Sequence, residues 1–224
     1  RSAMGKLIVI EGTDGSGKST QFSLLTTRLE QENKPFRRLV FPRYSEESSA
    51  LIRMYLGGQF GTKPSDVNAF AASAFYAVDR YASYKQDWGK WYEEGGLVLS
   101  DRYTTSNAVH QASKLPGEET ESFVRWLFDY EYGLLGLPKP SCVIFLDMPT
   151  ELSLQLLQVR QGESGDIHEL NHEYLAECRR RSLEICKMDG WKIVSCAENG
   201  KLRSPEAINQ DILKILSVEL GVTL

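Results

Sequence analysis

Hydrophobic residues along the chain gather in five short runs, with longer stretches of helical periodicity between them. The runs are rich in β-branched and large apolar residues and predict strands at residues 6–10, 38–41, 97–100, 142–146 and 191–195. The first intervening stretch places Phe22, Leu25 and Leu29 on one side of a helix, and the others predict helices at residues 66–84, 118–132, 151–160, 173–189 and 205–220. Apolar strands that alternate with helices are typical of a parallel sheet covered on both faces. We therefore expect an α/β fold.

The organisation of the chain is simple. No repeat, linker or low-complexity segment divides it, so we expect one domain over residues 4–224. Residues 161–165 are polar, contain two glycines and lie between two predicted helices, which favours a loop that could act as a lid at residues 160–170. Residues 1–3 precede Met4 and resemble a cloning remnant.

Composition narrows the class of ligand. The 224 residues are 42% hydrophobic and 25% charged, an ordinary globular balance, and the net charge of −4 argues against a nucleic-acid partner. A small anionic ligand would need only a local positive pocket. The four cysteines show no C-x-x-C spacing, which argues against a zinc or redox site and favours reduced thiols in a cytoplasmic protein. No apolar run reaches the roughly 18 residues of a membrane helix, so we expect no membrane partner.

One stretch carries a motif with a known mechanism. Residues 12–19, GTDGSGKS, match the phosphate-binding pattern G-x-x-x-x-G-K-[ST] in full, between a predicted strand and a predicted helix. In that context the glycines let successive N–H groups face phosphates, and the helix N-terminus adds partial positive charge. We expect Lys18 to reach the β- and γ-phosphates of ATP and Ser19 to ligate Mg²⁺. The expected ATP-binding residues are Gly12, Thr13, Asp14, Gly15, Ser16, Gly17, Lys18, Ser19 and Thr20. The alternative is a glycine-rich turn without a ligand.

A phosphate loop alone does not identify a kinase, because GTPase switches use the same loop. Those proteins also need a base-reading N-K-x-D segment. The Asn33-Lys34 pair here continues with Pro35-Phe36, which argues against a switch.

Charged residues follow two other predicted strands, at the edge of a parallel sheet where ligands bind. Arg43 comes just after the second strand and could clamp an acceptor phosphate; the alternative is a solvated surface charge. Asp101 and Arg102 follow the third strand, where Asp101 could hold Mg²⁺ through water and Arg102 could offset charge on a transferring phosphoryl group. The alternative for this pair is a structural ion pair.

Taken together, these motifs resemble those of the thymidylate kinase family, in its bacterial form. The resemblance covers residues 5–220 and rests on motifs at family-like spacing: the phosphate loop, Phe41-Pro42-Arg43, the run YAVDR ending at Arg80, the run DRYTTSN ending at Asn107, LDMP ending at Pro149, and the lid-like Asp166-Ile167-His168-Glu169. It implies a P-loop nucleoside monophosphate kinase fold with a five-stranded parallel sheet, transfer of the ATP γ-phosphate to dTMP, and a homodimer packed through helices.

The resemblance also implies roles for residues around the acceptor. Tyr76 fits an aromatic that stacks on thymine and Arg80 an arginine that bonds the base carbonyl, and four residues apart they share a helix face. Phe75 faces about 100° away and is expected to pack in the core. Alternatively, Tyr76 is itself a core residue.

Three further positions are assigned in the same way. Ser106 and Asn107 match the pyrimidine-binding run, with a helix cap as the alternative role of Asn107. His110 falls where other members carry an aromatic that crowds the sugar 2′ position, and Asp14 matches a contact to the acceptor's 3′-hydroxyl.

The chain departs from the family pattern in one respect that bears on catalysis. Members place an arginine either in the phosphate loop after the acidic residue or in the lid, but Gly15 and Ile167 stand at those positions. Residues 161–169 of the expected lid contain no lysine or arginine, and Arg160 is the positive residue nearest to them. We expect Arg160 to supply the missing charge. Alternatively, it is a solvated residue at a helix end. The expected catalytic set is therefore Lys18, Arg43, Asp101, Arg102 and Arg160. Competing functions are a nucleoside, dUMP or dCMP kinase, and a nucleotide-binding regulator without turnover.

Overall fold

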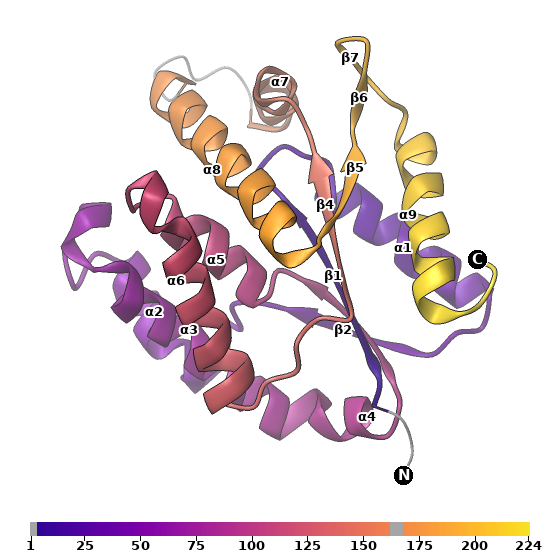
Figure 1. The fold of residues 1–224 in the computed structure, drawn as a ribbon, viewed down its shortest axis with the longest axis horizontal. Helices are drawn as coiled ribbons and strands as arrows, with labels where there is room; N and C mark the ends of the chain where they lie inside the picture. The colour runs from indigo at the N-terminus through magenta and orange to yellow at the C-terminus, as the bar shows by residue number, and fades with distance from the viewer. Residues whose placement is uncertain (1–3, 162–167) are drawn as a thin grey trace. The chain divides into compact units, whose positions relative to one another are not determined.

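The computed structural model describes residues 4–161 and 168–224, and the side chains of residues 4–160 and 172–224 (Figure 1). Five strands form one sheet in the order β2-β3-β1-β4-β5, and β4 and β5 run parallel with Ile144 opposite Lys192. The prediction of a five-stranded parallel sheet flanked by helices is confirmed. The strands lie within two residues of the expected ends: β1 (Lys6–Gly12), β2 (Phe36–Val40), β3 (Leu97–Asp101), β4 (Cys142–Asp147) and β5 (Lys192–Ser195).

The chain packs into two compact units, and β1 contributes residues to both. Unit 1 comprises residues 4–9 and 37–140, and unit 2 comprises Ile10–Phe36 and the described residues from Ser141 onward. In unit 1, α3 packs against α2 and α5, and α5 packs against α6. The helices of this unit are α2 (Ala50–Leu56), α3 (Ala69–Ser83), α4 (Gly89–Glu93), α5 (Thr104–Ala112) and α6 (Thr120–Phe128).

Two predicted helices of unit 1 have different bounds in the structure. The helix expected at residues 66–84 begins at Ala69, because the Asn68 side chain accepts a hydrogen bond from Ala71 N at 2.9 Å and caps it. The helix expected at residues 118–132 is α6 followed by a π-helical turn, η5 (Asp129–Leu134). A second π-helical turn, η3 (Tyr84–Trp88), joins α3 to α4.

Helix α5 was not among the predicted elements. Its sequence, TTSNAVHQA, is rich in threonine, serine and asparagine, which favour caps and turns over helix interiors. Nearly every residue of the helix is nevertheless buried, so its contacts with α3 and α6 hold it in place.

In unit 2, α1 packs against α9, α7 against α8, α8 on β4 and α9 on β5. These helices are α1 (Lys18–Gln31), α7 (Thr150–Gln161), α8 (His168–Asp189) and α9 (Pro205–Leu220). The bounds of α9 match the prediction, because Ser204 caps it by accepting from Ala207 N at 3.1 Å and Pro205 takes its first position. Helix α8 begins five residues earlier than expected.

Residues 197–203, between the last predicted strand and the last predicted helix, contain a hairpin of β6 (Ala197–Glu198) and β7 (Lys201–Leu202). Its turn is Asn199-Gly200, and both residues have positive φ, 53° and 75°. Asn-Gly is the dipeptide that two-residue hairpins with this backbone prefer.

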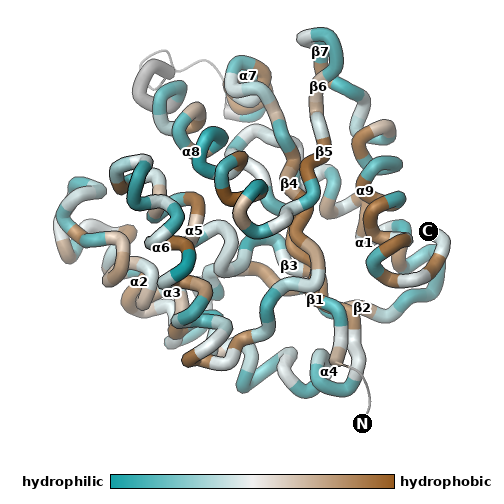
Figure 2. Tube along the Cα trace, viewed as in Figure 1, coloured by the Kyte–Doolittle hydropathy of each residue, from teal (hydrophilic) through white to brown (hydrophobic). Residues whose placement is uncertain are grey.

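The buried core includes most of strands β1, β3 and β4 and the inner faces of the helices. Figure 2 shows β4 mostly in brown, whereas α8 alternates between teal and brown, as expected for a helix with one face packed. Among the described residues, none of the helices is long and apolar enough to cross a membrane. The four cysteines are buried and form no disulfide in the described part of the chain. Most of the expected lid lies outside the described residues, including Asp166, Ile167 and the side chains of His168 and Glu169.

Candidate functional site

The expected phosphate loop links β1 to α1 in unit 2. Gly15 and Gly17 have φ of 79° and 82°, values that only glycine adopts without strain, and Ser16 N donates to Thr13 O at 3.1 Å. At Gly12, an added Cβ would lie 2.3 Å from Ser16 Oγ. Each glycine of the motif is therefore fixed either by its backbone conformation or by close packing.

The side chains of the loop differ in exposure. Asp14, Ser19 and Thr20 are exposed, Thr13 and Ser16 are buried, and Lys18 begins α1 in a half-buried position. The positive N-terminal end of the 14-residue helix α1 therefore lies directly after the loop, where it favours an anion.

Gly15 packs against helix α7. An added Cβ at this position would lie 2.4 Å from the carbonyl oxygen of Ser153 and 2.9 Å from Leu157 Cγ. The loop therefore has no room for a side chain at Gly15, which gives a physical reason for the departure noted in the sequence. Arg160 lies on the last turn of α7 and is exposed. It is seven residues beyond Ser153 and three beyond Leu157, and hence on the helix face that meets the loop.

In unit 1, Arg43 follows β2 and is anchored on the buried carboxylate of Asp79 from α3. The Arg43 backbone N donates to Asp79 Oδ2 at 2.8 Å, and Arg43 Nε donates to Oδ1 at 3.3 Å. Ser48 Oγ accepts from Arg43 Nη2 at 3.0 Å and donates to Asp79 Oδ1 at 2.6 Å. Only 17% of the Arg43 side chain is exposed, so its guanidinium is fixed by Asp79 and Ser48 and is not freely solvated.

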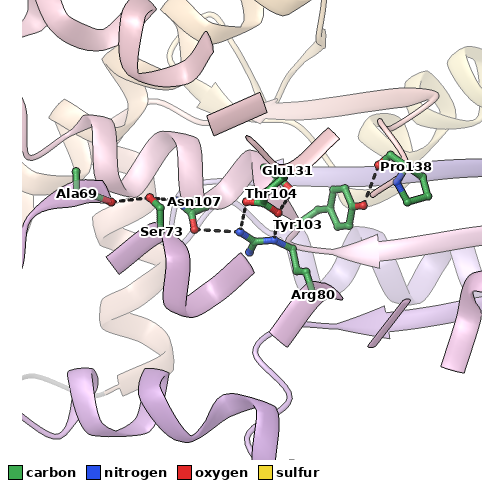
Figure 3. A network of polar contacts seen from close by, with 8 residues as sticks. All are labelled: Ala69, Ser73, Arg80, Tyr103, Thr104, Asn107, Glu131 and Pro138. Atoms are coloured by element: carbon green, nitrogen blue, oxygen red, sulfur yellow. Dashed lines mark hydrogen bonds and ion pairs between the residues drawn. The ribbon is translucent and has the colours of Figure 1, made fainter. Parts of the chain in front are cut away.

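Arg80 and Glu131 form a buried ion pair at the centre of a polar network (Figure 3). Arg80 Nε and Nη2 donate to the two Glu131 carboxylate oxygens at 2.7 and 2.6 Å, and Nη2 also donates to Asn107 Oδ1 at 3.0 Å. Asn107 Nδ2 donates to Ser73 Oγ at 2.7 Å, and Thr104 Oγ1 donates to Glu131 Oε1 at 2.8 Å. Burial lowers the pKa of Arg80, but the adjacent Glu131 carboxylate outweighs that effect and raises it.

Asn107 lies inside α5, whose N-cap is Tyr103, so the helix-cap alternative for Asn107 is wrong. Its amide uses one donor on Ser73 and one acceptor position on Arg80. One donor and one lone pair are thus not used by these two bonds, which is what a pyrimidine edge would need.

Tyr76 lies one turn before Arg80 on α3 and is half-buried. Its ring meets the Tyr55 ring edge-on at 6.4 Å. Burial, with smaller contributions from Tyr55 and Tyr44, raises the pKa of Tyr76 to about 12 against the opposing effects of Arg80 and Arg102. The ring is therefore neutral at physiological pH. Phe75 is half-buried like Tyr76 and packs on Tyr55 and Phe60, and not in the central core as expected.

Asp101 and Arg102 sit at the end of β3, and both are partly exposed. Arg102 has a φ of +75°, an uncommon value for a residue with a side chain. Its Nη1 lies 3.4 Å from His110 Nε2 of α5, so the structure brings these two expected acceptor residues together.

Residues 10–210 match the family model described as thymidylate kinase. The chain belongs to the thymidylate kinase family. A thymidylate kinase of Mycobacterium tuberculosis is 32% identical over 180 residues, 79% of this chain and 81% of the relative. A thymidylate kinase of Danio rerio is 26% identical over 210 residues, 93% of this chain and 88% of the relative. The solved structure of thymidylate kinase from Candida albicans aligns with a TM-score of 0.72 at 26% identity, covering 99% of this chain and 95% of the other.

Within this family member, the expected site residues fall into two groups. Unit 1 holds Asp101, expected to hold Mg²⁺, and most of the expected acceptor residues, which are Arg43, Tyr76, Arg80, Arg102, Ser106, Asn107 and His110. Unit 2 holds the phosphate loop, including Asp14, and Arg160.

Sequence reasoning missed the acids that hold Arg43 and Arg80 in place. Asp79 stands next to Arg80 in the quoted run YAVDR, so its place in a motif was a usable signal. Glu131 lies 51 residues from its partner, and only its position between two tyrosines in a predicted helix marked it.

Proposed function

We propose that this chain transfers the γ-phosphoryl group of ATP to dTMP and so forms dTDP and ADP. The observation that carries the proposal is the family match over residues 10–210, which includes a complete phosphate loop on a strand–loop–helix unit. ATP is the phosphate donor and dTMP the acceptor that membership of this family implies.

The geometry of the acceptor residues supports the following roles. Arg43 is held by Asp79 and Ser48 and would clamp the phosphate of dTMP. Tyr76 offers a neutral ring for stacking on the base. Arg80 and Asn107 would bond the polar edge of the pyrimidine, and Ser106 and His110 complete the expected acceptor set.

The reaction is an in-line transfer between two anions, so it needs positioning and positive charge. The acceptor phosphate has a second pKa of about 6 and is already a nucleophile at neutral pH, so no strong general base and no covalent intermediate are required. Lys18, Arg43 and Arg102 would supply fixed charges, and Arg160 the charge that Gly15 cannot carry.

Mg²⁺ is the metal that fits this chemistry, because it offsets negative charge on the transferring phosphates when bound. Ser19 presents an exposed hydroxyl on the first turn of α1, and Asp101 presents a carboxylate at the end of β3. These are hard oxygen donors of the kind that Mg²⁺ prefers. Among the described residues no cluster of three or more metal-ligating side chains occurs, so phosphates and water would provide the remaining ligands.

A coupled assay of ADP release tests the proposal. ATP would be supplied with dTMP, dUMP, dCMP or thymidine in turn, and with no acceptor as the control. We expect kcat/KM for dTMP to exceed that for each other acceptor by at least about tenfold, because Arg43 needs a phosphate and Arg80 a base carbonyl. Faster turnover of another acceptor, or ADP release that does not depend on dTMP, would contradict the proposal.

We also propose that the protein is a cytoplasmic homodimer. Support for the dimer comes from the family resemblance and from α3, where Phe70, Val78 and Tyr81 are exposed by 39–46% and fall on one side of the helix. Support for the compartment comes from four buried cysteines that form no disulfide within the described residues. Light scattering after gel filtration tests the first part by giving the molar mass of the parent protein and of Phe70→Glu. A monomeric mass for the parent protein, unchanged in the variant, would contradict the dimer.

A further inference from the structure

Glu131 is a buried carboxylate that the proposed phosphoryl transfer does not use. It lies on the π-helical turn η5, is fully excluded from solvent, and pairs with Arg80, which is only 2% exposed. π-helical turns of this kind occur often at functional sites. Taking a carboxylate and a guanidinium out of water is unfavourable unless the geometry between them is close to ideal, so such a pair calls for an explanation beyond stability.

The hydrogen bonds of Arg80 account for three of its five N–H groups. Glu131 takes the Nε–H and one Nη2–H, and Asn107 Oδ1 takes the second Nη2–H. Among the residues that the structure describes, none accepts a hydrogen bond from Nη1. The guanidinium is therefore fixed in orientation by partners from α5 and η5, and its two Nη1–H donors remain for a ligand.

Glu131 is itself held in place from a second side. Thr104 Oγ1 donates to Glu131 Oε1, the oxygen that also accepts from Arg80 Nε, and Leu137 N donates to the Glu131 backbone carbonyl at 3.0 Å. The network in Figure 3 thus runs from Ser73 through Asn107 and Arg80 to Glu131 and Thr104. Each member bonds to at least one other member of the network, which fixes the orientation of the group as a whole.

We propose that Glu131 is a positioning residue that turns Arg80 Nη1 toward the base and thereby makes the enzyme select keto pyrimidines over amino pyrimidines. Arginine has only donors, so a fixed Nη1 can bond the 4-keto oxygen of thymine but meets another donor in the 4-amino group of cytosine. The inference rests on the proposed function and adds to it the residue through which Arg80 discriminates.

Glu131→Asp tests the proposal without removing the buried charge. The shorter side chain keeps the ion pair but withdraws the carboxylate by one methylene, so it can no longer hold both nitrogens of Arg80 in the same position. We expect kcat/KM for dTMP to fall by at least about tenfold, mostly through KM, because small displacements of a positioned group are costly. KM for ATP should stay within about twofold, and the ratio of kcat/KM for dTMP over dCMP should fall by about the same factor as kcat/KM for dTMP.

A matched control is Glu93→Asp, the same change in the same unit at a carboxylate that accepts from Tyr84 Oη at 2.6 Å. This variant should behave like the parent enzyme. Unchanged KM and unchanged discrimination in Glu131→Asp would overturn the proposal. An equal loss for dTMP and dCMP would also overturn it, since that result indicates a merely structural role.

A double mutant separates action through Arg80 from other effects. If Glu131 acts only through Arg80, adding Glu131→Asp to Arg80→Lys should change kcat/KM for dTMP by less than about twofold. A further loss as large as in the single variant would count against the proposal. The parent enzyme is assayed first: absence of dTMP turnover there refutes the proposed function, whereas turnover with an insensitive Glu131→Asp refutes only this inference.

Discussion

Two buried acids determine how the arginines of unit 1 are presented. Asp79 accepts three hydrogen bonds, two from Arg43 and one from Ser48, and Glu131 accepts three, two from Arg80 and one from Thr104. In each case a carboxylate that touches no substrate in the proposed reaction immobilises a cation that does. Charge alone would not achieve this, because a flexible arginine loses entropy whenever it orders on a ligand.

Asp79→Asn is expected to lower kcat/KM for dTMP by about ten- to a hundredfold, with KM for ATP unchanged within about twofold. The amide removes the charge beside Arg43 and replaces one acceptor by a donor. The matched control is Asp87→Asn, because Asp87 pairs with Arg37 at 3.2 Å on the surface and both side chains are about half exposed. Steady-state kinetics of the two variants check the prediction, and equal behaviour of both would contradict it.

Arg160→Ala is expected to lower kcat by more than about tenfold, since loss of a positive charge near a transferring phosphoryl group is costly. Arg180→Ala is the control, because Arg180 is an exposed arginine of α8 paired with Glu177. Single-turnover rates with saturating ATP and dTMP measure the effect. A loss smaller than tenfold would show that Arg160 is only a solvated residue at the end of α7.

At the scale of elements, the sequence predicts the strands and helices whose positions are determined by the hydrophobic pattern and by capping residues. The five strands are apolar runs, and α9 carries Ser204 and Pro205 at its start, so their positions are confirmed. Helix α5 could not be predicted because its own residues disfavour a helix, and its burial in unit 1 overrides them. The hairpin at Asn199-Gly200 is not among the predicted elements, although that dipeptide favours a two-residue hairpin turn.

The residues of the candidate site likewise fall into those that a local sequence pattern predicts and those that only packing brings together. The phosphate loop and Arg43 are predictable because they follow strands, where ligands bind in α/β sheets. The partners of the arginines are not, because Asp79 and Glu131 lie 36 and 51 residues from the side chains they hold. Only packing brings such residues together, and no local pattern encodes it.

The contact between the phosphate loop and α7 predicts an unequal effect of two glycine substitutions. Gly200→Ala has a φ of +75° and open space around an added Cβ, so it should cost about 1–2 kcal/mol of unfolding free energy from backbone strain alone. Gly15→Ala adds the collision with Ser153 and should cost about 1–3 kcal/mol more. Urea unfolding of both variants checks the difference, and equal losses would mean that the loop can move away from α7 freely.

At the scale of the whole molecule, stability should decline in alkali. Burial raises the pKa of Cys142 to about 11 and those of Cys186 and Cys196 to about 12, from 9.0. Above pH 9 the unfolded chain releases these protons while the folded chain keeps them. The contribution of these protonated thiols to the free energy of unfolding is therefore fully present below pH 9 and is lost as the pH rises toward 12.

Cys186→Ala should make this decline shallower. The free energy of unfolding of the variant should fall less steeply between pH 9.5 and 10.5, by up to about 1.4 kcal/mol per pH unit, because one proton fewer is involved. Ser182→Ala is the control, since Ser182 is buried on the same helix and does not titrate in this range. It should lower stability equally at all pH values. Parallel pH profiles for Cys186→Ala and the parent would contradict the prediction.

The close approach of Gly15 to Ser153 also bears on how this enzyme can evolve. A change of Gly15 to arginine would give the loop the positive charge that it lacks. In this protein, however, the new side chain would collide with α7 and could not take up a position beside the phosphates. The benefit of that arginine thus depends on an earlier shift of the helix, so the two changes are epistatic and their order is constrained. In proteins that evolve from this loop, the positive charge must therefore come from another element of the structure. Selection for activity from a mutant library that varies only position 15 should recover glycine.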